Sequence, residues 1–157
     1  MIIDPCSMRI PTQNAQPTTH NPQPTTAPRS VAYYELDRSA WPVVTVTFDD
    51  PPTDDAFDDY LSDLEALYDE EEPFALIFDA RTASYLPSRY RQWQADWIAD
   101  NEALIERYLA GTAYVIPTAV LRGVLRAVFA LQDQPSPYTI VGSMDEARSW
   151  VEEQLSR

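Results

Sequence analysis

The chain has no lysine, a single histidine (His20), a single cysteine (Cys6) and three glycines. One cysteine excludes a disulfide within the chain, and one histidine leaves too few nitrogen and sulfur ligands for a zinc or iron site. The absence of lysine excludes Schiff-base and lysine-base catalysis. The three glycines stand far apart in the sequence, so neither a GxGxxG loop nor a Walker A phosphate loop can form.

Nucleophilic hydrolysis and membrane insertion also lack their sequence signals. There is no GxSxG elbow, and a Ser–His pair would need His20, which lies in a Pro- and Thr-rich stretch. No apolar run approaches the ~20 residues of a membrane span. The start, MIIDPCSMRI, does not read as a signal peptide. We therefore expect a cytoplasmic protein with no membrane span, no metal and no cofactor.

The chain is rich in acid instead: 25 Asp and Glu stand against 11 basic residues, all Arg, for a formal net charge of −14. Two explanations for the missing lysine stay open. Codon bias in a GC-rich genome can replace Lys by Arg, or the protein is adapted to a high-salt cytoplasm, in which crowded carboxylates stay hydrated and screened. Under either explanation, the acidic surface disfavours nucleic acid and anionic membranes as partners.

The composition changes near residue 30. Residues 1–30 are rich in Pro, Thr, Gln and Asn and lack any apolar period, which is typical of a disordered tail. From residue 31 onward the pattern is regular. The sequence therefore predicts a disordered tail over residues 1–30 and one folded domain over residues 31–157.

Strands and helices alternate along residues 31–157. Residues 43–50 alternate with a period of two, as in a half-buried strand, whereas residues 74–80 (FALIFDA) are continuously apolar, which is typical of a central strand buried on both faces. The order β-β-α-β-α-β-α-β-α predicts an α/β domain with a mixed, mostly parallel sheet of four to five strands. The predicted strands are 31–37, 43–50, 74–80, 112–116 and 136–142, and the helices lie in 51–72, 88–111, 118–132 and 144–155.

Each of the four predicted helices has a distinctive sequence feature. Residues 51–72 are capped by Thr53 or Asp54 and carry a solvated acidic face, because the segment lacks the glycine of a calcium loop. Residues 88–111 read as one long helix with Gly111 at its C′ position. Residues 118–132 are apolar almost all round. The last helix is predicted to begin at a Ser143 cap, with Glu146 placed for a capping box.

The stretch FALIFDARTASYLPS places an aspartate at the end of the predicted central strand and hydroxyl groups in the loop that follows. We interpret this loop as a candidate phosphorylation or contact site made by Asp79, Arg81, Thr82 and Ser84. The alternative is an enzyme that uses Asp79 with an arginine. No base, metal ligand set or phosphate loop accompanies it, so no catalytic residue is predicted.

Arginine and aromatic residues gather in residues 81–126, whereas residues 31–80 hold one arginine and many acids. Two interpretations stay open. The arginines pair with the carboxylates of the acidic helix, or they form an interface of the kind enriched in Arg, Tyr and Trp. The candidate interface residues are Arg89, Tyr90, Arg91, Arg122 and Arg126.

The segment order resembles the STAS/SpoIIAA-like superfamily, in particular its bacterial SpoIIAA-like, STAS/SEC14-type members. The resemblance covers residues 31–157 and lies in the initial hairpin, the strand that ends in Asp-Ala-Arg, and the segments RQWQADWI, GTAYVIPTAVLRGVLRAVFAL and DEARSWVEEQL. It implies a sheet packed against helices and used for protein–protein contact. In the anti-sigma-factor antagonists of this superfamily, the loop after the central strand carries a phosphorylatable Ser in an Asp-Ser-Ser-Gly motif. Here that loop reads DARTASYLPS; it lacks the motif and offers Thr82 and Ser84 as hydroxyls.

These observations together predict a non-enzymatic regulatory or scaffold module that contacts another protein or a second copy of itself. The superfamily also suggests an alternative, a small apolar, lipid-like ligand bound beneath residues 112–131. An enzyme that uses Asp79 is the third hypothesis and has the least support in the sequence.

Overall fold

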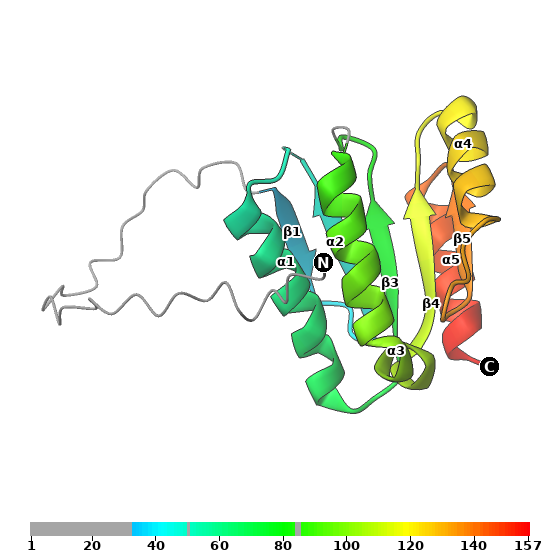
Figure 1. Ribbon diagram of the computed structural model, residues 1–157. Helices are drawn as coiled ribbons and strands as arrows, with labels where there is room; N and C mark the ends of the chain where they lie inside the picture. Colours follow the sequence, from blue (N-terminus) through cyan, green and yellow to red (C-terminus); the bar gives the residue numbers. More distant parts are fainter. Residues whose placement is uncertain (1–32, 50, 84–85) are drawn as a thin grey trace, which may run out of the picture. The chain divides into compact units, whose positions relative to one another are not determined.

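The computed structural model describes residues 33–49, 51–83 and 86–157. Its strands form one sheet in the order β1-β2-β3-β4-β5 (Figure 1). The first pair is antiparallel and the other three pairs are parallel, so the predicted α/β class with a mixed, mostly parallel sheet is confirmed. The predicted tail over residues 1–30 lies outside the described residues. The strands are β1 (Tyr34–Asp37), β2 (Val43–Phe48), β3 (Phe74–Asp79), β4 (Leu109–Val115) and β5 (Tyr138–Val141).

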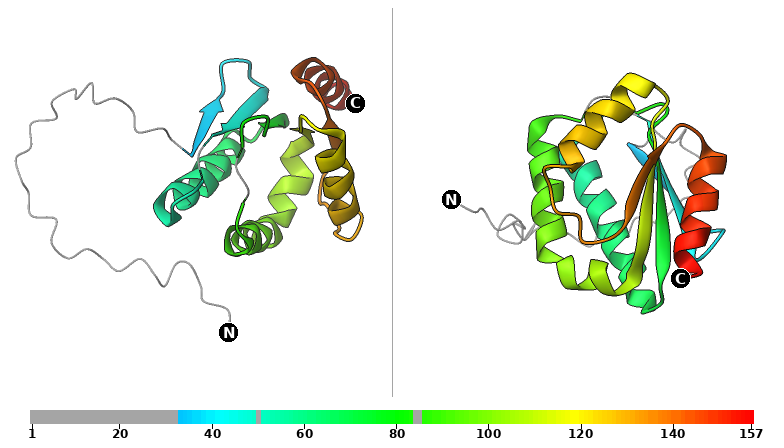
Figure 2. Two further views of the ribbon diagram at one scale, coloured as in Figure 1. Left: turned by 90° about the horizontal axis from the view of Figure 1, so that it is seen from above. Right: turned by 90° about the vertical axis from the view of Figure 1, so that its right-hand side faces the viewer.

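The helices cover the two faces of the sheet unequally. Figure 2 shows α5 alone on one side of the sheet and the other α-helices on the opposite side. Within the described ranges, no helix is both long enough and apolar enough to cross a membrane. The helices are α1 (Asp54–Leu67), the short 3-10 helix η2 (Tyr68–Glu70), α2 (Ser88–Asp100), α3 (Glu102–Tyr108), α4 (Ala119–Phe129) and α5 (Met144–Leu155).

Strand β3 is the centre of the core. All six of its residues are buried, as the continuous apolar run predicted. Phe74, Leu76 and Phe78 face the large core under α1, α2 and α3, whereas Ala75 and Ile77 face the smaller core under α5. Side chains alternate along a strand, so a strand buried on both faces needs a covering layer on each side.

The large core is built mainly of aromatic rings. Tyr33, Phe48 and Phe57 all lie with ring centroids 5.4 to 6.0 Å from that of Tyr60, whose hydroxyl accepts a hydrogen bond from Gln94 at 3.3 Å. Burial raises the pKa of Tyr33 to about 12 and raises that of Tyr60 as well, so these phenols stay protonated at neutral pH.

Hydroxyl side chains cap three of the helices. Thr53 Oγ1 accepts from the Ala56 amide at 3.2 Å, and Ser143 Oγ accepts from the Glu146 amide at 3.3 Å, which confirms the predicted caps of α1 and α5. The carboxylate of Glu146 accepts from the Gly142 amide at 3.1 Å rather than from Ser143, so the reciprocal contact of the capping box is shifted by one residue. Helix α4 begins in the same way, at Thr118.

The prediction of one helix over residues 88–111 is wrong. The chain leaves helical geometry at Asn101 (φ −110°, ψ 12°), whose side-chain amide donates to the Trp97 carbonyl at 2.8 Å. A second helix, α3, then ends at Tyr108. Strand β4 begins at Leu109, which pairs with Phe74 of β3, so Gly111 lies inside a strand and not at a helix C′ position. The apolar period continues across Asn101, and only pairing with β3 sets the start of β4.

Small residues allow α5 to lie close to its face of the sheet. A Cβ atom added to Gly111 would come within 2.8 and 2.9 Å of the Trp150 ring and within 3.1 Å of Gln154. Ala75, Ala113 and Ala147 are fully buried in the same layer. The absence of a side chain at Gly111 therefore sets how closely the Trp150 ring approaches β4.

The two glycines at positions 111 and 123 should respond oppositely to the same substitution. We expect Gly111→Ala to lower the free energy of unfolding by about 1–3 kcal/mol, because the added methyl group overlaps Trp150. Gly123 lies within α4, and an added Cβ atom meets nothing within 4 Å. Gly123→Ala should therefore raise the free energy of unfolding by about 0.5–1 kcal/mol through helix propensity. Urea unfolding of both variants measures this; changes of the same sign would contradict the described packing.

Candidate functional site

The polar residues singled out in the sequence lie at the carboxyl edge of the parallel strands. Asp79 is the last residue of β3, and Asp49 directly follows β2. Strands β2 and β3 are neighbours in the sheet. Asp79 pairs with Thr47 of β2 and with Val115 of β4. Its carboxyl group is on the α5 side, because it continues the row of Ala75 and Ile77.

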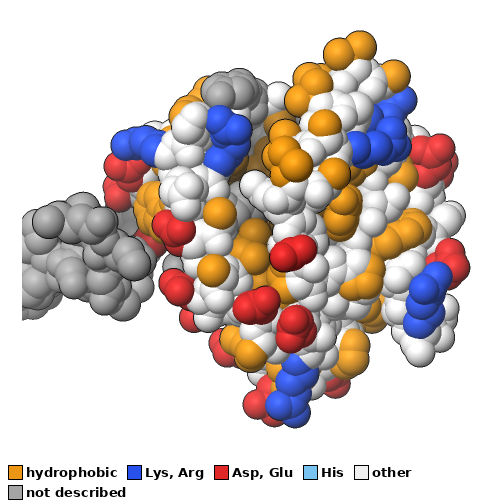
Figure 3. Space-filling view, turned by 45° about the vertical axis from the view of Figure 1, so that its right-hand side comes forward, with side chains coloured by type: hydrophobic (Ala, Val, Ile, Leu, Met, Phe, Trp, Pro, Cys, Tyr) orange, Lys and Arg blue, Asp and Glu red, His pale blue; other side chains and the backbone are white. Residues whose placement is uncertain are grey.

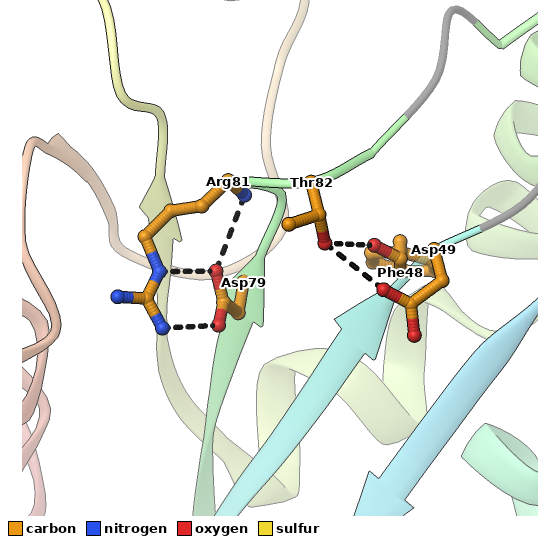
Figure 4. A network of polar contacts seen from close by, with 5 residues as sticks. All are labelled: Phe48, Asp49, Asp79, Arg81 and Thr82. Carbon is orange, nitrogen blue, oxygen red and sulfur yellow. Dashed lines mark hydrogen bonds and ion pairs between the residues drawn. The ribbon is translucent and has the colours of Figure 1, made fainter.

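Asp79 and Arg81 form a closed ion pair. Arg81 donates from Nε to Asp79 Oδ1 at 2.9 Å and from Nη2 to Oδ2 at 2.8 Å, and its backbone amide also donates to Oδ1 at 3.2 Å (Figure 4). Asp79 is 6% exposed, whereas half of the Arg81 side chain is in solvent. The hydrogen bonds from Arg81 lower the pKa of Asp79 more than burial raises it, so the carboxyl group is held as an anion.

Thr82 turns the other way and ties the loop to β2. Its hydroxyl group lies 3.1 Å from the Phe48 carbonyl and 3.0 Å from a carboxylate oxygen of Asp49 (Figure 4). Both partners are acceptors, so the hydroxyl proton is held between them. A phosphate at Thr82 would lose both contacts and would face the Asp49 carboxylate.

The structure thus brings Asp79 and Arg81 together and places Thr82 with a different partner. Ser84 lies outside the described residues. The two carboxylates, Asp79 and Asp49, are each bound to a separate group of the loop. These contacts anchor residues 81–82 to the ends of two neighbouring strands.

Arg89, Tyr90 and Arg91 lie on the first turn of α2. The Tyr90 hydroxyl donates to Asp54 at 2.7 Å, Arg89 forms an ion pair with the same carboxylate, and Arg91 donates to Ser88 at 2.8 Å. Tyr90 is only 3% exposed, so a place in an exposed interface does not fit its burial. The sequence left two interpretations open for these arginines: pairing with the acidic helix or a place in an interface. Arg89 forms an ion pair with the acidic helix α1.

Arg122 and Arg126 face the sheet and donate to backbone carbonyl groups. Arg122 Nη1 donates to the carbonyls of Ile116 at 2.9 Å and Pro117 at 3.2 Å, and Arg126 Nη2 donates to that of Ile140 at 3.0 Å. Within the described ranges, neither forms an ion pair with a carboxylate.

The contact of Arg126 protects the edge of the sheet. The carbonyls of Pro137 and Val141 accept from β4, so by alternation the carbonyl of Ile140 points away from the ladder, at the free side of the edge strand β5. A guanidinium donor at that carbonyl satisfies one of the unpaired groups that make edge strands prone to association.

Beside these two arginines, α4 presents an apolar surface to solvent. Leu125 and Phe129 lie on the inner side, where the Phe129 ring packs against Tyr114 and Tyr138 with centroids 5.1 Å apart. No residue of α4 is buried. Five of the six exposed large apolar residues in the described part of the chain belong to α4 or the turn after it, and Figure 3 shows them gathered along this helix. We call this surface the α4 outer face: Val120 (77% exposed), Leu121 (54%), Val124 (57%), Val128 (39%) and Leu131 (89%), with Gly123 and Ala127 between them.

The exposure of the α4 outer face is the feature that sequence reasoning missed. The sequence showed a helix that is apolar almost all round, and the alternative hypothesis was that this helix covers a small apolar ligand. A surface helix normally turns its charged side to water. The positions of the two arginines therefore predicted the wrong side of the helix as the exposed one. One sequence feature could have indicated the exposed apolar face: the helix has no acidic residue although the chain is strongly acidic.

The described residues offer little support for a ligand or metal site. No three of their His, Cys, Asp and Glu side chains gather as metal ligands would. A hollow of about 480 Å³ lies between the end of α4 and β5, lined by residues between Phe129 and Tyr138 that include Gln132, Asp133 and Gln134. This polar lining differs from the apolar pocket predicted beneath residues 112–131, and the ligand hypothesis stays a prediction.

The Asp79–Arg81 pair predicts an acid-sensitive contribution to stability. We expect Asp79→Asn to lower the free energy of unfolding at neutral pH by about 1–2 kcal/mol, because the bidentate charged contact is lost. The pKa of Asp79 is lower in the folded state than in the unfolded state, where it is ~3.9. The stabilisation is therefore full above ~pH 4 and is lost as the pH falls through the folded pKa.

Urea unfolding of both proteins between neutral and acidic pH measures the effect, and the difference between wild type and Asp79→Asn should disappear at the acidic end. Asp100→Asn is the matched control, since it removes the same charge from an exposed position at the end of α2. If both substitutions change stability equally, Asp79 has no special role.

Comparison with known proteins identifies the fold. No family model matches the chain, and no curated protein matches it. Among solved structures, it is similar to the crystal structure of an uncharacterized protein from the DUF3478 family with a SpoIIAA-like fold, from Shewanella loihica PV-4. The two share 12% sequence identity with a TM-score of 0.58, and the match covers 75% of this chain and 91% of that one. The superfamily resemblance drawn from the sequence is thus confirmed at the level of architecture: residues 33–157, as far as described, have a SpoIIAA-like fold.

Proposed function

We propose that this chain is a non-enzymatic regulatory or scaffold module that acts through protein–protein contacts, and that the α4 outer face is its contact surface. The observation that carries the proposal is the exposure of five large apolar side chains along one helix. Contiguous apolar surface of this kind is uncommon on monomeric proteins and typically marks an interaction site. The SpoIIAA-like fold is compatible with such a role.

The polar residues support the same proposal. Both carboxylate oxygens of Asp79 are bound by Arg81, which disfavours a role for Asp79 as a nucleophile or a base. Arg126 attaches α4 to the edge strand β5, and Arg122 attaches it to the segment between β4 and α4, with the apolar side of the helix outward. A rigid helix that presents branched apolar side chains is the form of surface used in helix-mediated recognition.

A photo-crosslinking amino acid placed on α4 tests the proposal in the cells that produce the protein. Replacing Val124, at the centre of the α4 outer face, should give discrete protein adducts, because a partner that covers this face lies against that position. Ala103 is the matched control, since it is exposed on another helix, α3. Adducts that appear equally from both positions, or from neither, would refute α4 as the contact surface.

A further inference from the structure

We infer that the α4 outer face packs against the same face of a second copy of this chain, around a two-fold axis that passes between Val124 and Ala127. The inference rests on the proposed function, since it concerns the same surface, and it names the partner. Three features of the described residues carry it: the distribution of charge, the relief of the helix, and the direction of its arginines.

The charge of the chain restricts where two copies can meet. Two copies of a chain with a net charge of −14 repel each other, so they can meet only where the surface has few carboxylates. Between Glu106 and Asp133 there is no Asp or Glu, which is the longest such stretch of residues 31–157. Helix α4 lies in the middle of it.

The arginines of α4 lie outside the α4 outer face. Arg122 and Arg126 donate to backbone carbonyls toward the sheet, and although Arg126 remains exposed beside it, the residues of the α4 outer face carry no charge of either sign. A partner selected by charge complementarity would require a charged face. In an isologous contact, a face meets an identical face, and a neutral face meets its own image without repulsion.

The surface of α4 has a raised row and a low row of residues that are complementary to each other. Val120, Val124 and Val128 are spaced by four residues and form a raised row, whereas Gly123 and Ala127 form a low row beside it. An added Cβ atom at Gly123 would meet nothing within 4 Å, so the space over this row is empty in one copy. A two-fold axis places the valine row of each copy over the low row of the other.

The helices should cross in an antiparallel sense. Rows spaced by four residues pack into one another at a crossing angle of about 50°. An antiparallel pair also keeps the two positive helix N-termini apart. Helix α4 is only about 16 Å long. The contact is therefore smaller than the ~800 Å² per partner of a standard interface, and we expect a reversible dimer with a dissociation constant on the order of tens of micromolar.

Sedimentation velocity of the full chain tests the inference. Over ~1 to ~100 μM protein the average mass should rise from that of one chain toward that of two. The dimer should strengthen from ~0.1 to ~1 M NaCl, because salt screens the repulsion between acidic copies while leaving the apolar contact intact. A contact held by ion pairs would weaken instead. Weakening with salt, or a single chain at every concentration, would overturn the inference.

A matched pair of substitutions assigns the dimer to α4. Ala127→Glu should raise the dissociation constant at least tenfold, because it places a carboxylate at the two-fold axis. Ala103→Glu makes the same change at an exposed position of α3 and should leave the dissociation constant unchanged. Circular dichroism and thermal unfolding show that both variants fold. If the two variants dimerise equally well, the contact is elsewhere and the inference fails.

Disulfide trapping tests the geometry. In a Cys6→Ser background, Val124→Cys should form a disulfide between two copies, since the two residues lie near the axis. Val120→Cys should not, because its two copies would be separated by about 16 Å along the helices. Disulfides require Cα atoms roughly 4.4–6.8 Å apart. Equal trapping at both positions would overturn the antiparallel pairing.

The two proposals fail in different ways. If the protein stays a single chain but the crosslinker at Val124 captures a protein of another mass, the second-copy inference is wrong and the proposed function stands. If the adduct has twice the mass of one chain and is lost in Ala127→Glu, both are supported. If Val124 gives no adduct and no dimer forms, both are wrong.

Discussion

The fold depends on the burial of β3 on both faces. A strand without an exposed residue must be covered from two sides, and the chain does this with unequal layers. One helix, α5, is enough on one side because Ala75, Gly111 and Ala113 allow it to approach the sheet closely. On the other side, aromatic residues fill a thicker core under α1, α2 and α3. Little of the sheet is then left for α4, which lies beside the edge strand β5 and buries none of its residues.

The position of α4 explains where its arginines bind. An edge strand exposes carbonyl groups, and a guanidinium group can satisfy them with several donors in a fixed geometry. Arg126 reaches the Ile140 carbonyl of β5, whereas Arg122 donates to the carbonyls of Ile116 and Pro117, which precede the helix. Leu125 and Phe129 take the inner side of α4, and its other large apolar residues are turned to solvent. Exposed apolar area costs about 25 cal/mol per Å² relative to burial, so a partner that covers this face gains a driving force without any change in the rest of the domain.

The polar residues that follow β3 make contacts within the domain. Asp79 is held by Arg81, and Thr82 reaches back to the end of β2. These contacts fix the path of the chain from the central strand towards α2. The first turn of α2 is in turn attached to α1 through Tyr90 and Asp54. Among the described residues, this edge of the sheet is a set of mutually satisfied polar contacts.

The sequence by itself determined the class of the fold, the central strand, the caps at Thr53 and Ser143, and the scarcity of catalytic groups. These follow from local periodicity, capping chemistry and composition, each of which acts over a few residues. Only the tertiary structure decided where the helix over 88–111 breaks, because pairing with β3 draws Leu109 into β4. It also decided which side of α4 faces water. The arginines there bind carbonyls of residues up to 14 positions away, and no helical pattern records whether such an acceptor exists.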